Sequence, residues 1–230
     1  MEEEARIYEA YQRRKASGKR YFHGSTRATS SWRKIWSSAY SRRSSGTAWR
    51  RCVRNRYWRS VAATVRWLRE FIKWGARPEN LAGVDLLADR IAQACRLGPP
   101  GVVLACGNAA QLDFADGSFD IVLQATVFTS ILDVVLKKQV ADEMVRVLKP
   151  DGVVLWYDFR VNNPRNPDVR GIERAEIERL FSNCRVTLKR ITLAPPLLRA
   201  LAPYSWLGSY LLSSIPWACS HYLGTIQKLR

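Results

Sequence analysis

The chain has 230 residues and a formal net charge of +17, and its length suits one domain with one sizeable core. Its five cysteines are scattered with no CxxC pair, which argues against a disulfide framework and against a zinc site. The first residues lack an apolar signal region, and no run of about 18 apolar residues predicts a membrane-spanning helix. These features favour a reducing, cytoplasmic location.

The positive charge is concentrated in one stretch. Residues 10–69 hold 17 Lys and Arg and no Asp or Glu, whereas the other 170 residues balance 20 basic against 20 acidic side chains. Tryptophans and serines are scattered through the stretch without a sustained period of 2 or 3.6 residues. Because a fold needs a continuously apolar face, residues 1–66 are predicted to form a poorly ordered basic segment ahead of a domain at 67–230.

From Trp67 onward, helix-like and strand-like patterns alternate along the chain. A short helix closed by Gly75 comes first, and an edge strand at 186–193 comes late. Between them we expect strands at 80–87, 100–108, 119–128 and 153–160, and helices at 88–97, at 136–149 (ended by Pro150, Asp151 and Gly152) and from about Arg174. The alternation predicts an α/β fold, a Rossmann-like doubly wound and mostly parallel sheet with helices on both faces.

Ligands of such sheets bind at the carboxyl ends of the strands, and three of these ends carry a recognisable string. The strings are AGVDLL, GNAAQLDFADGSFDIVL and EMVRVLKPDGVVLWYDF. Together they resemble the class I S-adenosylmethionine-dependent methyltransferases (type 11-like), whose GDAxxLPFxDxSFDxV and RVLKPGG patterns they approach over residues 67 to about 160. The resemblance implies a cofactor-binding core at 67–160, followed at 161–230 by a substrate-side loop, an edge strand and an apolar cap.

The resemblance also implies which residues hold S-adenosyl-L-methionine. Asp85, with Leu86 beside it, falls where the family binds both ribose hydroxyls, and a carboxylate can accept two hydrogen bonds at once. Asn108 replaces the Asp that usually accepts from the adenine amino group, and Ala109 would offer its backbone N–H to the ring. Gln124 falls beside the methionine part of the cofactor.

Each of these residues also has a structural interpretation. Asp85 could be the N-cap of the helix that begins near Ala88, and Asn108 could simply form a turn with Gly107. Gln124, a single polar residue at a strand end, is as compatible with a structural role as with binding. No residue pattern singles out a metal site or a catalytic residue.

The chain departs from the family where a first strand and an ExGxGxG loop should precede Trp67. No glycine lies between Gly46 and Gly75, so the backbone there cannot pass close under a cofactor, and we expect the first strand and the glycine loop to be missing or disordered. Permissible codons read one nucleotide earlier let residues 56–65 spell VLEIGCGNG and residues 23–41 spell WFNPGHLFMEEDMEQRLL. We therefore hypothesise a frameshift, genomic or from sequencing, that opens near Tyr21 and closes near Arg66.

Methyl transfer in this family is an in-line displacement that depends chiefly on alignment. The string QATVF differs from the N/D-P-P-F/Y of enzymes that methylate exocyclic amines, which argues against a nucleobase amine as acceptor. The string YDFRVNNPRNPDVRGI resembles the loop after the fifth strand in family members that act on small molecules, lipids or glycans, which implies an acceptor of that type. Asp158 and Asn162 could contact the acceptor or belong to a turn cluster. His221 could be a general base or a packing residue.

A second hypothesis comes from a different class of protein. Arginines interleaved with Trp and Tyr could bind phosphates and stack on bases. On this interpretation the chain is an inactive methyltransferase relative whose basic segment binds nucleic acid.

Overall fold

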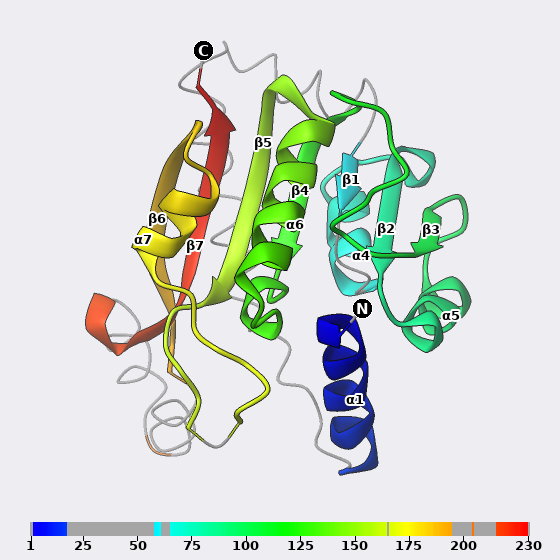
Figure 1. Ribbon diagram of the computed structural model, residues 1–230. Coiled ribbons are helices and arrows are strands. Elements are labelled where there is room, and N and C mark those ends of the chain that lie inside the picture. Colours follow the sequence, from blue (N-terminus) through cyan, green and yellow to red (C-terminus); the bar gives the residue numbers. More distant parts are fainter. Residues whose placement is uncertain are drawn as a thin grey trace.

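A mixed seven-stranded sheet forms the centre of the protein, in the order β3-β2-β1-β4-β5-β7-β6 (Figure 1). The computed structural model describes residues 2–17, 58–60, 65–164, 166–194, 204 and 215–229. The strands are β1 (Trp58–Ser60), β2 (Leu81–Asp85), β3 (Val103–Cys106), β4 (Phe119–Ala125), β5 (Leu148–Phe159), β6 (Cys184–Leu193) and β7 (Cys219–Lys228). The pairings among β1 to β5 are parallel, and β7 runs antiparallel to both β5 and β6. The predicted α/β fold is confirmed.

Helices cover both faces of the sheet. They are α1 (Glu2–Ala16), α4 (Val65–Lys73), α5 (Ala88–Leu97), α6 (Val134–Val147) and α7 (Arg174–Leu180), with short 3-10 turns η1 (Pro78–Asn80), η2 (Phe128–Ser130) and η3 (Pro216–Ala218). Helices α6 and α7 lie over one face (Figure 1) and bury Val122, Val154 and Trp156. Helix α4 packs on the other face against Leu123 and Leu155. Successive side chains of one strand thus enter opposite cores, which is why these strands read as continuous apolar runs.

Most predicted elements lie where the sequence puts them. The helix at 88–97 is α5 to the residue, and α4 is followed by Gly75 in the left-handed conformation at φ 99°. The helix–strand junction differs, because α6 ends at Val147 and β5 already begins at Leu148 rather than after Gly152. Pro150 explains this, since its ring disfavours helical backbone in the residue before it and removes one backbone donor.

The first strand differs from expectation. The sequence predicts that it is missing or disordered, but β1 lies between β2 and β4, with Trp58 opposite Leu81 and Ile121. A ladder of backbone hydrogen bonds needs no particular side chains, so a short strand can occupy this position. Residues 61–64, where a glycine loop would follow, lie outside the described residues, as do residues 18–57 of the basic segment. The division of the chain at residue 67 stays a prediction, and α1 and β1 are the described parts of its first segment.

Strand β7 is the element that the sequence did not reveal. The C-terminal region was expected to form an apolar cap, but Cys219–Lys228 inserts between β5 and β6. Its buried polar residues Ser220, His221 and Thr225 interrupt the apolar run that usually marks a central strand. Residues 195–214, which precede it in the sequence, lie outside the described residues except for Tyr204.

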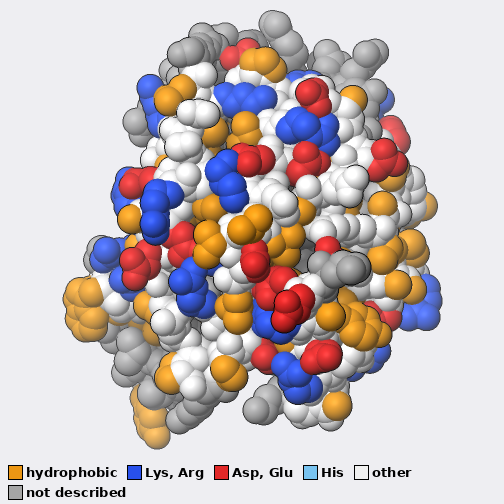
Figure 2. All heavy atoms as spheres, viewed as in Figure 1, with side chains coloured by type: hydrophobic (Ala, Val, Ile, Leu, Met, Phe, Trp, Pro, Cys, Tyr) orange, Lys and Arg blue, Asp and Glu red, His pale blue; other side chains and the backbone are white. Residues whose placement is uncertain are grey.

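The described surface is mixed in charge. Acidic and basic side chains are interspersed over the face that carries α6 and α1 (Figure 2). Several form ion pairs within their own helix, such as Lys138 with Asp142 in α6 and Arg13 with Glu9 in α1. No helix among the described residues has an apolar stretch long enough to span a membrane.

We predict that Gly224→Ala destabilises the fold by about 2–3 kcal/mol, because overpacking a close backbone contact costs this much. An added Cβ at Gly224 would lie 2.1 Å from the carbonyl oxygen of Thr187 on the neighbouring strand. Gly107→Ala is the matched control, since its Cβ would meet nothing closer than Val84 Cγ1 at 3.7 Å. Urea unfolding measures both, and equal free energies of unfolding for the two variants would contradict the close packing of β6 on β7.

Candidate functional site

The carboxyl ends of the parallel strands meet at one edge of the sheet, and α1 lies beyond this edge (Figure 1). Glu3 in the first turn of α1 accepts the backbone N–H groups of Leu132 and Asp133, just before α6. Arg6 donates to the backbone oxygen of Ser130 over 2.6 Å. The amino-terminal helix therefore forms one wall of the site at this edge.

Asp85 ends β2 and presents a largely buried carboxylate, 12% exposed. One oxygen accepts the N–H of Leu87 at 3.0 Å, and the other lies 3.1 Å from Arg90 Nη1. Burial raises the pKa of this carboxyl, while the Arg90 guanidinium lowers it. Helix α5 has Leu87 as its N-cap residue, without a side-chain cap, so Asp85 is not the helix N-cap. Each carboxylate oxygen keeps a lone pair for a further donor.

Asn108 follows β3, the strand that neighbours β2. The backbone N–H of Gly107 donates to the backbone oxygen of Asp85 at 3.0 Å and ties the ends of β2 and β3 together. Asn108 Oδ1 accepts the N–H of Ala110 at 2.8 Å, and its amide nitrogen donates to Glu4 of α1. The turn anticipated at this position is therefore present, and it leaves one lone pair of Oδ1 for a ligand.

Leu86 and Ala109 pack at their inner sides against the core below α6. Gln124 is buried, 1% exposed, and its Oε1 accepts the N–H of Val127 at 3.1 Å. Its Nε2 has no hydrogen-bond partner among the described residues. The structure thus brings Asp85, Leu86, Asn108 and Ala109 together, and sets Gln124 apart from them inside the sheet.

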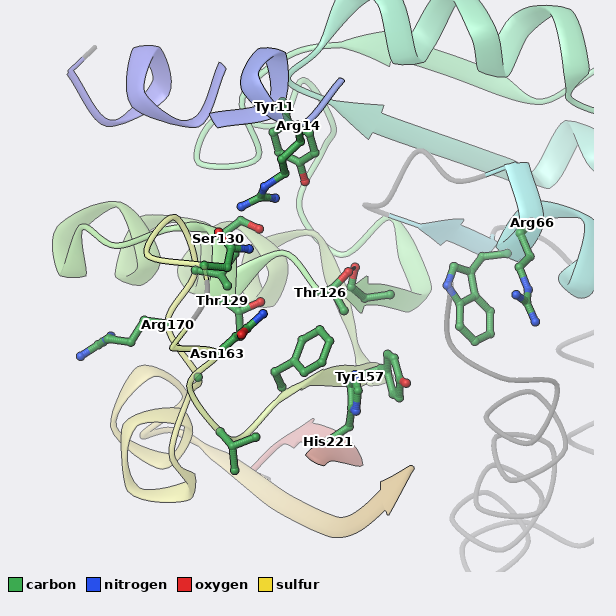
Figure 3. A pocket seen from close by; sticks show the side chains of 17 residues that line it. Tyr11, Arg14, Arg66, Thr126, Thr129, Ser130, Tyr157, Asn163, Arg170 and His221 are labelled. Carbon is green, nitrogen blue, oxygen red and sulfur yellow. Dashed lines mark hydrogen bonds between the residues drawn. The ribbon is translucent and has the colours of Figure 1, made fainter. Parts of the chain in front are cut away.

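A cavity of about 250 Å³ opens at the same edge, beyond the ends of β4 and β5 (Figure 3). Its aromatic wall comprises Tyr11, Trp67, Tyr157 and Phe159, with His221 of β7. Its cations are Arg14, Arg66 and Arg170, the last two at opposite sides of the cavity in Figure 3. No Asp or Glu is among the described residues that line it. The cavity therefore suits a compact, partly aromatic or apolar molecule, and donors predominate around it.

The loop after β5 was expected to face a substrate, and its residues Asn163, Val169 and Gly171 do line the cavity. Asn162 does not line this cavity and instead accepts the N–H of Gly171 at 2.8 Å, so its predicted contact with an acceptor is not supported.

Asp158 is fully buried, so of its two suggested roles the contact with the acceptor is not supported. It accepts the N–H groups of Phe128 and Thr129 at 3.0 and 3.3 Å and the Thr129 hydroxyl at 2.7 Å. Burial raises its pKa to about 6, and these hydrogen bonds oppose the rise. Its role is to hold η2, whose Thr129 and Ser130 line the cavity.

His221 lies in the cavity wall beside Tyr157, as Figure 3 shows. Burial lowers its pKa to about 3, so its imidazole is neutral near pH 7. Tyr157 is buried too, and burial raises the pKa of its phenol to about 12. The sequence offers His221 only as an isolated candidate. Its surroundings include Tyr157 of β5, Thr192 of β6 and Ser220 of β7, so no local sequence pattern marks the site.

Known proteins resemble this chain in sequence and in fold. A protein family described as "Methyltransferase domain" matches residues 61–156. A relative 29% identical over 104 residues is the 2-methyl-6-phytyl-1,4-hydroquinone methyltransferase of Synechocystis sp., and the match covers 44% of this chain and 32% of that protein. The chain spans about a third of the length of the curated relatives it matches.

Two solved structures share the fold. The PH0226 protein from Pyrococcus horikoshii superposes with a TM-score of 0.57 at 15% identity, covering 90% of this chain and 93% of that one. Geranyl diphosphate C-methyltransferase from Streptomyces coelicolor, solved with Mg²⁺, geranyl diphosphate and S-adenosyl-L-homocysteine, gives 0.54 at 15% identity, covering 76% and 71%. Residues 61–156 thus match a methyltransferase domain, and the chain shares its fold with both solved structures.

Proposed function

We propose that this protein transfers a methyl group from S-adenosyl-L-methionine to a small-molecule, lipid or glycan-type acceptor bound in the cavity of Figure 3. The observation that carries the proposal is the pairing of two sites along one strand edge. Asp85 and Asn108 follow the neighbouring strands β2 and β3, whose ends the Gly107–Asp85 backbone hydrogen bond joins, and the cavity opens beyond β4 and β5. Side-by-side sites are what a direct transfer between two bound molecules requires.

The adenosine half of the methyl donor fits the residues present. The Asp85 carboxylate retains lone pairs for two ribose hydroxyls, and Asn108 retains one for the adenine amino group. Leu86 and Ala109 would flank the nucleoside, with the Ala109 N–H as a donor. The methionine half would lie toward the end of β4. We assign Gln124 to it, because its Nε2 is buried without a hydrogen-bond partner among the described residues. The donor supplies an electrophilic methyl group on a sulfonium.

The chain's own contribution to the reaction is alignment and exclusion of water. Tyr157 and Phe159 give the cavity an apolar wall, and α1 closes it at Tyr11 and Arg14. Holding the acceptor atom in line with the transferred methyl group accounts for a large part of the rate acceleration in such displacements. We place this small-molecule enzyme in the cytoplasm, because its scattered cysteines show no disulfide pattern and fit a reducing compartment.

The missing glycine loop supports a second candidate function. No glycine lies between Gly46 and Gly75, and side chains in place of the loop glycines would obstruct the methionine half of the donor. On this account the chain is an inactive relative whose basic segment binds nucleic acid. Oligonucleotide binding that weakens steeply with salt, together with no binding of S-adenosyl-L-homocysteine, would favour it.

We predict that Asp85→Asn weakens S-adenosyl-L-homocysteine binding at least about tenfold, because a lost hydrogen bond to a charged group costs about 1.5–3 kcal/mol. Asp89→Asn is the matched control, since Asp89 lies four residues away and its side chain is 46% exposed, paired with Lys15. Isothermal titration calorimetry measures both variants. Unchanged affinity in Asp85→Asn, or equal losses in the two, would contradict the assignment of Asp85 to the ribose.

We predict that the gene carries an open second reading frame across the codons for residues 21–66. Read one nucleotide earlier, these codons should encode the strand and glycine loop VLEIGCGNG at residues 56–65. Resequencing the gene tests this directly. Stop codons in the shifted frame, or a shifted frame without the glycine loop, would show that the basic segment is the authentic sequence.

A further inference from the structure

The His221 ring is held rigidly in the cavity wall. It stacks on Tyr157 with ring centres 4.7 Å apart and an interplanar angle of 11°, and its ring centre lies 3.8 Å from that of Phe159. Phe159 lies directly opposite His221 in the pairing of β5 with β7. Two aromatic neighbours on one strand leave the imidazole little freedom to rotate, so its two nitrogens have fixed surroundings.

Ser220 determines which nitrogen carries the proton. Its Oγ lies 3.2 Å from the backbone oxygen of Thr192 and 2.8 Å from His221 Nδ1. A carbonyl oxygen can only accept, so the single hydroxyl proton of Ser220 is donated to Thr192. Both hydrogen bonds of Ser220 can then form together only if His221 Nδ1 carries a proton and donates it to the Ser220 oxygen. Because a neutral imidazole has one proton, Nε2 holds a lone pair.

Thr192 is conformationally unusual in a way that serves this arrangement. Its φ is 65°, a left-handed value that is unfavourable for a β-branched residue. From this position its carbonyl reaches Ser220, and its hydroxyl lies 3.3 Å from the Tyr157 hydroxyl. One strained residue therefore contacts both the serine that orients the imidazole proton and the ring that stacks on the imidazole.

The lone pair of Nε2 is available to the contents of the cavity. Nε2 makes no hydrogen bond within the described part of the chain. The fully enclosed polar atoms that lack a partner do not include it, so it remains accessible. The neighbouring hydroxyls of Thr126 and Thr129 donate away from the cavity contents, to Ala125 O and to Asp158. A ligand donor that enters this wall therefore finds an acceptor at Nε2.

We propose that His221 is a catalytic residue whose Nε2 accepts a hydrogen bond from the methyl acceptor, and that the acceptor therefore presents a hydroxyl or N–H group to β7. Ser220 and Thr192 are positioning residues that keep this nitrogen unprotonated. The proposal rests on the proposed function, because the second molecule at the edge is the methyl donor. It narrows the acceptor from a general small molecule to one with an ionisable O–H or N–H at the transfer point.

The proton and electron balance is complete. A lone pair of the acceptor oxygen or nitrogen attacks the methyl carbon, and the carbon–sulfur bond breaks with its electrons on sulfur. The acceptor atom becomes positively charged, and its proton passes to His221 Nε2 and then to solvent. Desolvation keeps His221 a weak base, but an alkylated oxonium is a far stronger acid than the neutral hydroxyl, so a weak base suffices once the bond to carbon forms.

The tautomer is testable by NMR without any methyl transfer. The chain has two histidines, so ¹⁵N-histidine labelling gives two pairs of ring-nitrogen signals, and His23→Ala shows which pair belongs to His221. We expect His221 as the Nδ1–H tautomer, and we expect Ser220→Ala to move it toward Nε2–H. Thr225→Ala, at another buried polar residue of β7, is the control and should leave the tautomer unchanged. An Nε2–H tautomer in the native protein would overturn the proposal.

The acceptor class is tested on the same sample with phenol, and with anisole as its matched control that cannot donate. Phenol should shift the Nε2 signal upfield, and anisole should not. No phenol shift up to its solubility limit, or an equal shift with anisole, would contradict the proposal. Neither readout depends on Asp85, so a failure of this inference can be told apart from a failure of the proposed function, which calorimetry on Asp85 detects.

Discussion

The parallel backbone ladder is the constraint on which the rest of the structure depends. Because β1 to β5 run in one direction, Asp85, Cys106, Ala125 and Phe159 end at the same edge of the sheet. Apolar residues on both faces of β4 and β5 lock this register against α4 on one side and α6 on the other. A slip by one residue would exchange the two faces, so the positions of the polar strand ends follow from core packing.

Helix α1 completes the edge that the ladder creates. Its acidic first turn reaches the residues before α6 through Glu3 and the turn after β3 through Glu4. Tyr11 packs under the guanidinium of Arg90, which pairs with Asp85, and it also lines the cavity. One helix thus contacts both proposed binding sites, and Ile7 and Ala10 anchor it to the sheet by burial.

The sequence revealed those features that depend on local pattern. The fold class, α5, and the location of Asp85 and Asn108 at strand ends could be predicted, because apolar periodicity and short motifs mark them within a few residues. Features that depend on distant partners could not. Strand β7 is central but interrupted by Ser220 and His221, and these polar residues make sense only once Thr192 and Tyr157 lie beside them. Asp158 looked like a surface contact because its partners, Phe128 and Thr129, are 29 or more residues away.

The central claim is that the ends of β2 and β3 hold an adenosyl group whose sulfur faces the cavity beyond β4 and β5. A crystal structure of the protein with S-adenosyl-L-homocysteine tests it most directly. The account predicts ribose hydroxyls on the Asp85 carboxylate, adenine beside Asn108, and the sulfur directed toward the wall that contains Tyr157 and His221. A ligand bound elsewhere, or an Asp85 carboxylate still engaged by Leu87 and Arg90 alone, would contradict it.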